Sequence, residues 1–381
     1  MATVAIVHNH PIHYQHLLFC ELAKRGLDFE VLFVAAFSGN RMEAPFPKNS
    51  EYPFAVAHAG PYEKAPRIET ACFIWRALNR IRPSVVIISG YSDAAAWTAW
   101  LWSSLYRVKK ILWAESTILD HRRYAWRELP KRVFVKGCDS AHVYGTASLE
   151  YLEKLGMARD KIQTKRAVAN TALFLSASDA RAERPTAIRL LYCGRLSPEK
   201  NLPFLMRAFA RLNQDTESPR MTLKLVGYGP LEHALFDLAG ELGISKIVDF
   251  AGAKQQTELP LIFRNSDVFI LPSLSEPWGL VVNEAMLSGL PVAVSKRCGC
   301  AADLVRPETG WVFSPDNEIE LTNLLDGIAD ISRDVLEEMG RAGRSLAAEY
   351  CPENCSNAVM EMVNSLLPVP GKQVLSANAN S

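Results

Sequence analysis

Two carboxylates, Glu276 and Glu284, flank one expected helix start and are separated by seven residues. The apolar, β-branched run 268–271 before them has the length of a strand, and apolar residues recur with helical spacing from Leu280 to a Gly-Leu-Pro stop at 289–291. A helix N-terminus offers unpaired amides and a partial positive charge to an anion, and carboxylates accept hydrogen bonds from hydroxyls. The stretch therefore suits a sugar phosphate, although an acid in a first helical turn also serves the helix dipole alone.

Two cations follow the expected strand 189–193, after Gly194. Glycine allows the backbone to turn tightly here, and Arg195 and Lys200 come next in the chain. A diphosphate leaving group carries about two negative charges to be compensated, and arginine binds phosphate oxygens in pairs. Both side chains are therefore candidates for binding a diphosphate and for stabilising the charge that develops on it.

Four histidines follow the expected strand 4–7, at positions 8, 10, 13 and 16. A proline interrupts them and no i, i+4 pair forms, so the spacing favours histidines of a surface or polar pocket over a metal site. Within this run, His10, His13 and Tyr14 are the candidates for contacts with an acceptor.

Two acids follow later strands of the first half. Asp93 comes after strand 85–89 and is either a helix cap or a hydrogen-bond acceptor for a ligand. Glu115 comes after strand 111–114, where it either orients a sugar hydroxyl, takes the proton of an acceptor, or is a capping or solvated side chain.

One segment, residues 121–136, is strongly basic. Its only acid is Glu128, and its cations alternate with the aromatic residues Tyr124, Trp126 and Phe134; the cations are Arg122, Arg123, Arg127, Lys131, Arg132 and Lys136. Basic and aromatic side chains together are typical of a surface that binds an anionic membrane, and a solvated helix face is the alternative.

Length and composition limit the class of protein. The 381 residues suffice for two domains, and a net charge of +1 argues against a nucleic-acid binder. The first eight residues resemble a strand rather than a signal peptide, and the apolar segment Ala94–Tyr106 is too short to span a bilayer and is expected to be a buried helix. Of the eight cysteines, Cys20, Cys72, Cys138 and Cys193 are expected to be packing residues. The pairs Cys298/Cys300 and Cys351/Cys355 could bind a metal but have no further His or Cys at zinc spacing, and all eight are expected to be reduced in a cytoplasmic protein.

Strand-like and helical runs alternate along the chain, which predicts parallel sheets with helices on both faces. Ten strands are too many for one doubly wound domain. Because the composition changes near 169–184, we expect an N-terminal domain over 1–172, a C-terminal domain over 173–367 and a disordered tail over 368–381. The expected strands are 4–7, 30–34, 85–89, 111–114, 141–144, 189–193, 222–226, 248–251, 268–271 and 292–294.

The stretch from Glu276 through Pro-Trp-Gly-Leu to Glu284, with Ala-Met and Gly-x-Pro-Val after it, resembles the signature of family-four retaining glycosyltransferases. The run Gly-Arg-Leu-x-x-Glu-Lys-Asn-Leu at 194–202 is similar to the diphosphate clamp of that family. The resemblance implies the α/β fold GT-B, in which two Rossmann-like doubly wound domains face each other across a cleft. The last helix would cross back to the N-terminal domain.

The resemblance also implies roles for residues. Arg195, Lys200 and Glu276 would be catalytic, with Glu276 facing the sugar and Glu284 holding the ribose hydroxyls. Many relatives have a histidine close to the donor sugar where this chain has Glu115, and we expect Glu115 to be catalytic in its place. The other donor-binding residues would be Gly194, Gly227, Lys254, Pro277, Trp278, Gly279, Leu280 and Val281. The loop after the first strand lacks the Gly-Gly of many relatives, so the acceptors of those relatives do not carry over to this chain.

The implied activity is transfer of a hexose from an NDP-sugar to an acceptor hydroxyl, with retention, in the synthesis of a cell-surface polysaccharide or glycolipid. No Asp-x-Asp motif occurs where one would be expected, so no metal or other cofactor is required. The partners would be the donor, a saccharide or lipid-linked acceptor, and the inner face of a membrane. The alternatives are a nucleotide-sugar epimerase or hydrolase on the same fold, and a two-domain sugar-binding protein.

Overall fold

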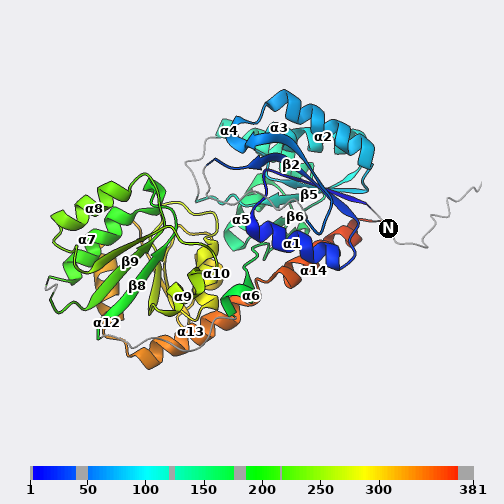
Figure 1. The fold of residues 1–381 in the computed structure, drawn as a ribbon. Coiled ribbons are helices and arrows are strands. Elements are labelled where there is room, and N and C mark those ends of the chain that lie inside the picture. The colour runs from blue at the N-terminus through cyan, green and yellow to red at the C-terminus, as the bar shows by residue number, and fades with distance from the viewer. Residues whose placement is uncertain (1–2, 40–49, 120–124, 176–185, 215–216, 368–381) are drawn as a thin grey trace, which may run out of the picture. The chain divides into compact units, whose positions relative to one another are not determined.

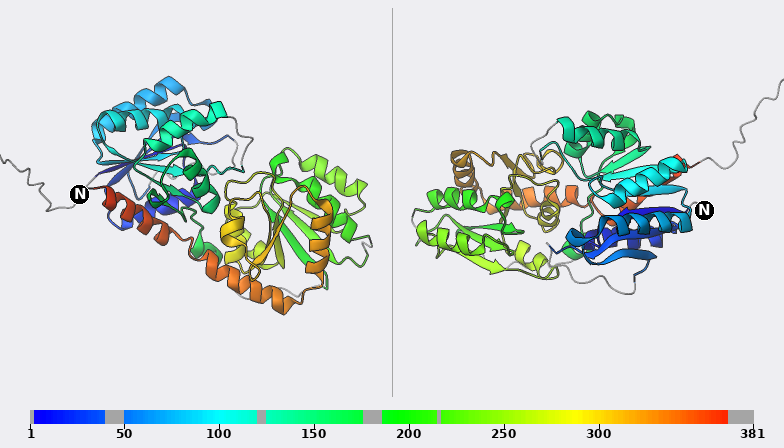
Figure 2. Two further views of the ribbon diagram at one scale, coloured as in Figure 1. Left: turned by 180° about the vertical axis from the view of Figure 1, so that it is seen from behind. Right: turned by 90° about the horizontal axis from the view of Figure 1, so that it is seen from above.

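Two parallel sheets with flanking helices make up the fold of the computed structural model, which describes residues 3–39, 50–119, 125–175, 186–214 and 217–367 (Figures 1 and 2). The chain divides into two compact units. The first contains residues 1–113, 130–142 and 356–381, and the second contains residues 114–129 and 143–355. The boundary expected at residues 172 and 173 stays a prediction.

The first sheet has seven strands in the order β3-β2-β1-β4-β5-β6-β7. Val4 of β1 lies opposite Phe29 of β2 on one side and Val85 of β4 on the other, both in parallel register. Strand order reverses between β1 and β4, and ligands of doubly wound sheets bind at the carboxyl ends of strands at such a point. The strands are β1 (Val4–His8), β2 (Phe29–Phe37), β3 (Phe54–Pro61), β4 (Val85–Ser89), β5 (Lys109–Ala114), β6 (Ser140–Val143) and β7 (Ile162–Gln163).

Helices cover both faces of the first sheet. α2 (Arg67–Ile81) and α3 (Ala94–Leu105) lie side by side on one face, and α1 (His13–Lys24) lies on the other (Figures 1 and 2). Strands β1 and β4 are the centre of the core, where Val4, Ala5 and Ile6 are fully buried. The other helices of this part of the chain are α4 (Ala125–Lys136), α5 (Thr146–Leu155), α6 (Thr171–Leu175) and α14 (Pro352–Leu366), with 3-10 turns at Tyr62–Lys64 and Arg159–Lys161.

The second sheet has six strands in the order β10-β9-β8-β11-β12-β13. They are β8 (Ile188–Cys193), β9 (Met221–Val226), β10 (Val248–Gly252), β11 (Val268–Leu271), β12 (Val292–Ser295) and β13 (Gly310–Phe313). Its order reverses between β8 and β11, which pair in parallel with Val268 opposite Leu190. The carboxyl ends of these two strands carry the two motifs with Lys200 and Glu276. The helices are α7 (Leu202–Leu212), α8 (Glu232–Glu241), α9 (Leu259–Arg264), α10 (Leu280–Leu287), α11 (Ala301–Leu304), α12 (Glu318–Ala329) and α13 (Arg333–Ala347), with a 3-10 turn at Pro198–Lys200.

All ten predicted strands are present, and the α/β fold is confirmed. The prediction missed β3, β7 and β13, because β3 is a half-buried edge strand without a clear period, β7 has two residues and β13 has four. Helix α3 is not buried all round as expected, since Leu101 and Leu105 are exposed on its outer face. The expected tail 368–381 lies outside the described residues.

Two further expectations concern the state of the cysteines and the presence of a membrane-spanning helix. All eight cysteines are free, and six of them are buried; Cys72, however, is exposed rather than packed. Among the described residues, no helix is long and apolar enough to cross a membrane.

Candidate active site

The loop after β11 is held in place by the turn at 298–300. The backbone N–H of Gly299 donates to the carbonyl of Glu276 (2.9 Å), and that of Cys300 donates to the carbonyl of Trp278 (3.1 Å). Gly279 begins α10 in the left-handed region with a φ of 96°, and a Cβ there would lie 3.0 Å from Cδ2 of Leu271. Glycine is therefore needed at this turn, and the loop presents Glu276 at the carboxyl edge of the second sheet.

Each cation of the expected clamp is paired with a carboxylate in the second unit. Lys200 forms an ion pair with Glu276, and the two side chains are 15% and 16% exposed, respectively. Arg195 donates to Glu199 (2.7 Å), which also accepts from the hydroxyl of Ser197 (2.7 Å). Burial would raise the pKa of Glu199, but the Ser197 hydrogen bond and the charges of Arg195 and Lys200 lower it. The two cations thus lie at the end of β8, and the carboxylates balance their charge.

Glycines let the loops after β8 and β9 approach closely. A Cβ at Gly227 would lie 1.8 Å from the carbonyl oxygen of Gly194, and one at Gly229 would lie 2.4 Å from that of Leu196. The predicted donor residues Gly194 and Gly227 are thereby brought together, with φ angles of 156° and 140°. Side chains at Gly227 and Gly229 would push the loop that carries Arg195 out of position.

Glu284 lies in α10 and is half-buried. Burial raises the pKa of its carboxyl to about 8. Its charge in turn contributes to the raised pKa of Cys193, after burial of that thiol, so Glu284 lies close to the end of β8. In the part of the chain that the structure describes, the Glu284 carboxyl has no hydrogen-bond or ion-pair partner, which is the arrangement expected of a group that a ligand satisfies.

The remaining predicted donor residues fall into two groups. Pro277, Leu280 and Val281 are partly exposed around the start of α10, and Lys254 is exposed after β10. The ring of Trp278 is buried instead, where it donates to Oδ1 of Asn283 (2.8 Å) and stacks on the ring of Tyr144. Trp278 therefore supports the loop from behind rather than lining its surface.

Glu115, at the end of β5, is held by two donors. Tyr144 Oη (2.8 Å) and Arg166 Nη2 (2.6 Å) both donate to its Oε1. Arg166 was not singled out from the sequence, because it follows the two-residue strand β7, which has no periodic signal.

The histidines after β1 do not converge. The ring of His8 is buried against Phe19 and Phe33. His10 lies beside Tyr62, and His16 hydrogen-bonds to Tyr52 Oη (3.2 Å). His13 is exposed and Tyr14 is partly exposed. No group of three metal-ligating side chains occurs among the described residues.

A polar cluster does form at the carboxyl edge of the first sheet. Tyr62 Oη donates to Asp93 Oδ2 (2.9 Å), and Asp93 Oδ1 caps α3 by accepting from Ala96 N (2.8 Å). Glu63 accepts from Ser38 Oγ (2.6 Å) and from the N–H of Gly39, and these hydrogen bonds lower its pKa to about 2. Sequence reasoning missed Tyr62 and Glu63 because they follow β3, which was not predicted.

Helix α4 carries the described part of the basic segment; Arg122, Arg123 and Tyr124 lie outside the described residues. Trp126 is 70% exposed, Leu129 and Val133 are also exposed, and they recur at helical spacing beside the exposed Arg132 and Lys136. Phe134, expected on the same surface, is fully buried.

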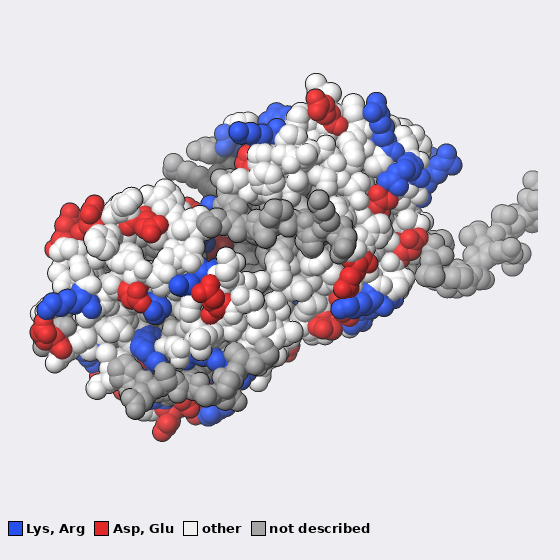
Figure 3. Space-filling model, viewed as in Figure 1, with Lys and Arg blue, Asp and Glu red and all other residues white. Residues whose placement is uncertain are grey.

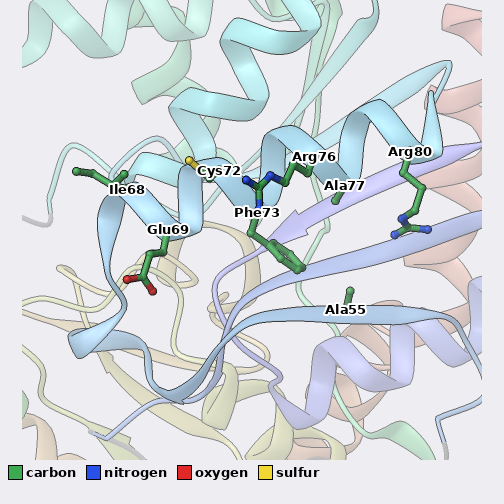
Figure 4. Close-up of a pocket in the computed structure, with 8 residues that line it drawn as sticks. All are labelled: Ala55, Ile68, Glu69, Cys72, Phe73, Arg76, Ala77 and Arg80. Atoms are coloured by element: carbon green, nitrogen blue, oxygen red, sulfur yellow. The ribbon is translucent and has the colours of Figure 1, made fainter.

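Charge elsewhere is mixed, and one groove lies away from these residues. On the face in Figure 3, Lys and Arg are interspersed with Asp and Glu. A groove of about 530 Å³ lies between α2 and β3, lined by Ile68, Cys72, Phe73, Arg76 and Arg80 among others (Figure 4). It contains no residue of the predicted site.

The fold matches solved structures over nearly the whole chain. A sucrose-phosphate synthase from Thermosynechococcus elongatus is 21% identical, with a TM-score of 0.77 over 96% of this chain and 99% of that one. Anabaena HepE in complex with UDP is 18% identical, with a TM-score of 0.72 over 96% of this chain and 100% of that one. These likenesses define the fold as GT-B.

Residues 177–346 match the profile of the family "Glycosyl transferases group 1". Among curated relatives, the sulfoquinovosyl transferase of Arabidopsis thaliana is 34% identical over 178 residues, 45% of this chain and 32% of that protein. Matches to the first three such relatives span 32% to 39% of their length. The similarity to group 1 glycosyltransferases is therefore shown for residues 177–346, in the second half of the chain.

Proposed function

We propose that the protein transfers a hexose from a nucleoside diphosphate sugar to an acceptor hydroxyl and retains the configuration of the anomeric carbon. The observation that carries the proposal is that Arg195, Lys200, Glu276 and Glu284 lie together at the carboxyl edge of the second sheet. Two cations suit a diphosphate, and two acids suit sugar and ribose hydroxyls. The UDP held by Anabaena HepE, which has the same fold, supports a nucleotide donor.

Two ion pairs of the second unit must break when the diphosphate of the donor binds. Lys200 now neutralises Glu276, and Arg195 neutralises Glu199. A bound diphosphate takes the place of the carboxylates on both cations, which frees Glu276 to accept hydrogen bonds from the sugar ring. The cations then stabilise the leaving diphosphate as the bond from the anomeric carbon to its oxygen breaks.

The acceptor oxygen attacks on the face that the leaving group departs from, and its proton passes to the leaving phosphate oxygen. Arg195 and Lys200 supply the charge compensation in this scheme, so no divalent cation is required. We expect chelation of divalent ions with EDTA to leave the rate within about twofold. A larger loss, restored by Mg²⁺, would contradict the metal-free scheme.

A thermal-shift screen tests the donor claim. UDP, GDP, ADP and dTDP, and the sugar esters of each, are added to the protein, and one base should raise its melting temperature. At a ligand concentration of 100 times Kd, binding stabilises the fold by about 2.7 kcal/mol. If none of the nucleotides raised the melting temperature, the donor site would be wrong.

Helix α4 supports a lipid-linked acceptor at an anionic membrane surface. Its exposed Trp126, Leu129 and Val133 are apolar, and Arg132 and Lys136 lie among them. Each cation near anionic lipid contributes about 1 kcal/mol, so replacing both should weaken vesicle binding at least tenfold.

Co-sedimentation with vesicles of neutral and of anionic lipid, at low and high salt, tests this surface. The variant Arg132→Glu/Lys136→Glu is compared with Lys246→Glu, which changes an exposed lysine outside α4. Equal binding of the wild type to neutral and anionic vesicles would leave α4 as a solvated helix face.

A further inference from the structure

Strand β3 is the open outer edge of the first sheet. It is last in the strand order and pairs with β2 alone among the described residues. Its residues, Phe54–Pro61, include no acid, lysine or arginine, and all of them are at least partly exposed. The pairing with β2 keeps its register as far as His58. Soluble proteins usually block such an edge with charged side chains, because its unpaired N–H and C=O groups can pair with another chain, and β3 has no such block.

The groove between β3 and α2 adds an apolar surface to this edge. Ala55 of β3 and Ala77 of α2 both line it, and their small side chains leave the space of about 530 Å³ unfilled (Figure 4). The ring of Phe73 points into the same groove, and Ile68, on the preceding turn of α2, is 80% exposed. The apolar surface therefore extends from the strand onto one side of the helix.

Two charges of opposite sign lie on that side of α2. Glu69 and Arg76 are exposed, line the groove and are separated by about two helical turns. Neither has a hydrogen-bond or ion-pair partner among the described residues, whereas Arg80 is paired with Glu30 (3.0 Å). This side of α2 is therefore complementary in charge to an antiparallel copy of itself, in which Glu69 lies opposite Arg76 of the second copy.

The centres of the strand and of the helix side lie at the same level. α2 runs back along β3, because only residues 62–66 connect them. The midpoint of the helix side, near Cys72, is about 7 Å along the helix from Ala77. Ala57, near the middle of β3, is about 7 Å along the strand from Ala55. Since Ala55 and Ala77 line the groove together, a single twofold axis can pass through both centres.

We propose that this edge is the interface of a homodimer with twofold symmetry. β3 of each copy pairs antiparallel with β3 of the other, which joins the two sheets, and the two α2 helices face each other across the joined grooves. Glu69 of each copy pairs with Arg76 of the other, so the interface has two equivalent ion pairs. The strands and the apolar groove supply the contact area, and the charges fix the register. The inference is independent of the proposed function.

Sedimentation of the protein over a series of concentrations measures the association. The wild type should reach the mass of two chains. Glu69→Arg and Arg76→Glu each place like charges opposite one another at two points, and each should raise the Kd of the dimer by about tenfold or more. The double variant Glu69→Arg/Arg76→Glu restores opposite charges at both points, and should return the Kd to within about threefold of the wild type.

The matched control is Arg341→Glu, which reverses an exposed arginine of α13 in the second unit and should leave the Kd unchanged. Recovery in the double variant separates a lost contact from a fold that the single substitutions damage. A wild type that remains monomeric at every concentration would overturn the proposal, as would a double variant that associates no better than the single ones.

Cross-linking through Cys72 locates the axis, because Cys72 is the exposed one of the eight free cysteines. A bismaleimide, which joins two thiols, should link two wild-type chains, and the linked dimer should be absent from Cys72→Ser. Ala57→Lys places a charge on the strand and should lower the yield about fivefold. A linked dimer that persists in Cys72→Ser would place the contact elsewhere on the molecule and overturn the assignment to β3 and α2.

Discussion

The carboxyl edges of the two sheets are built differently. In the second unit, residues with full charges lie in two short motifs, and each cation there is paired with an acid, as in Lys200 with Glu276. In the first unit, Tyr62, Asp93, Glu63 and Ser38 come from three separate loops and satisfy one another by hydrogen bonds. The first arrangement suits a charged diphosphate that exchanges ion pairs, and the second suits an uncharged, hydroxyl-bearing acceptor.

The largest expected effect is at the clamp. Lys200→Ala should raise the activation free energy by about 3 kcal/mol and so lower the rate about 10²-fold. The substitution removes charge stabilisation of the leaving group and leaves Glu276 without its partner. Arg195→Ala should lower the rate by a similar factor. Steady-state rates are compared with those of Lys224→Ala, whose lysine pairs with Asp249 on the neighbouring strand. Rates within threefold of wild type in both clamp variants would remove the assignment.

Next in size is the effect of pH on stability through Glu284. Its pKa is about 8 in the folded protein, above its ordinary value of 4.5, so the folded state holds the proton more tightly. Stability contributed by this group is present at low pH and is lost as the pH rises from 4.5 to about 8. Glu284→Gln should therefore match the wild type near pH 5 and exceed its free energy of unfolding by on the order of 2 to 3 kcal/mol near pH 8. Denaturant unfolding at both pH values measures the difference in free energy of unfolding, and an equal difference at both would contradict the raised pKa of this half-buried carboxyl.

A smaller effect separates the two glutamates. Glu284→Gln should weaken free nucleoside diphosphate about tenfold, because Glu284 lies by β8, where we place the ribose. Glu276→Gln should mainly lower kcat and leave nucleotide affinity nearly intact, because it acts on the reacting sugar. Calorimetry with the free nucleotide and steady-state kinetics decide the matter. The reverse pattern would exchange the two roles.

The smallest effect is expected in the first unit. Tyr62→Phe removes one hydrogen bond to Asp93, worth about 1 kcal/mol, and should lower transfer to an added saccharide acceptor about fivefold. Hydrolysis of the donor by water and nucleotide affinity should not change, since the second unit is unaltered. Tyr106→Phe, at an exposed tyrosine, is the control. Equal loss of transfer and hydrolysis would contradict the assignment of acceptor binding to the first sheet and donor binding to the second.

The difference between the two sheet edges also explains which site residues could be predicted from the sequence. Strands β8 and β11 are short, largely apolar and buried, and each is followed by a turn that contains proline and glycine. Both strands, and Lys200 and Glu276 after them, could therefore be predicted. Edge strand β3 is half-buried and has no clear period, so Tyr62 and Glu63 could not be placed.

Contacts between residues far apart in the chain could not be predicted from the sequence either. Arg166 reaches Glu115 across 51 positions, and Lys200 reaches Glu276 across 76. The pairing of each cation with an acid, and the burial of Trp278 behind its loop, follow only from tertiary packing.

The central claim is that Lys200 and Glu276 serve transfer of a sugar from a nucleotide to an acceptor hydroxyl. NMR of the reaction with the nucleotide sugar that binds, in the presence of a saccharide acceptor, tests it most directly. The account predicts that free nucleotide and a new glycosidic anomeric signal appear together, with the anomeric configuration of the donor, and that both are strongly reduced in Lys200→Ala. An isomerised nucleotide sugar, free sugar as the only product, or tight binding without turnover would contradict it.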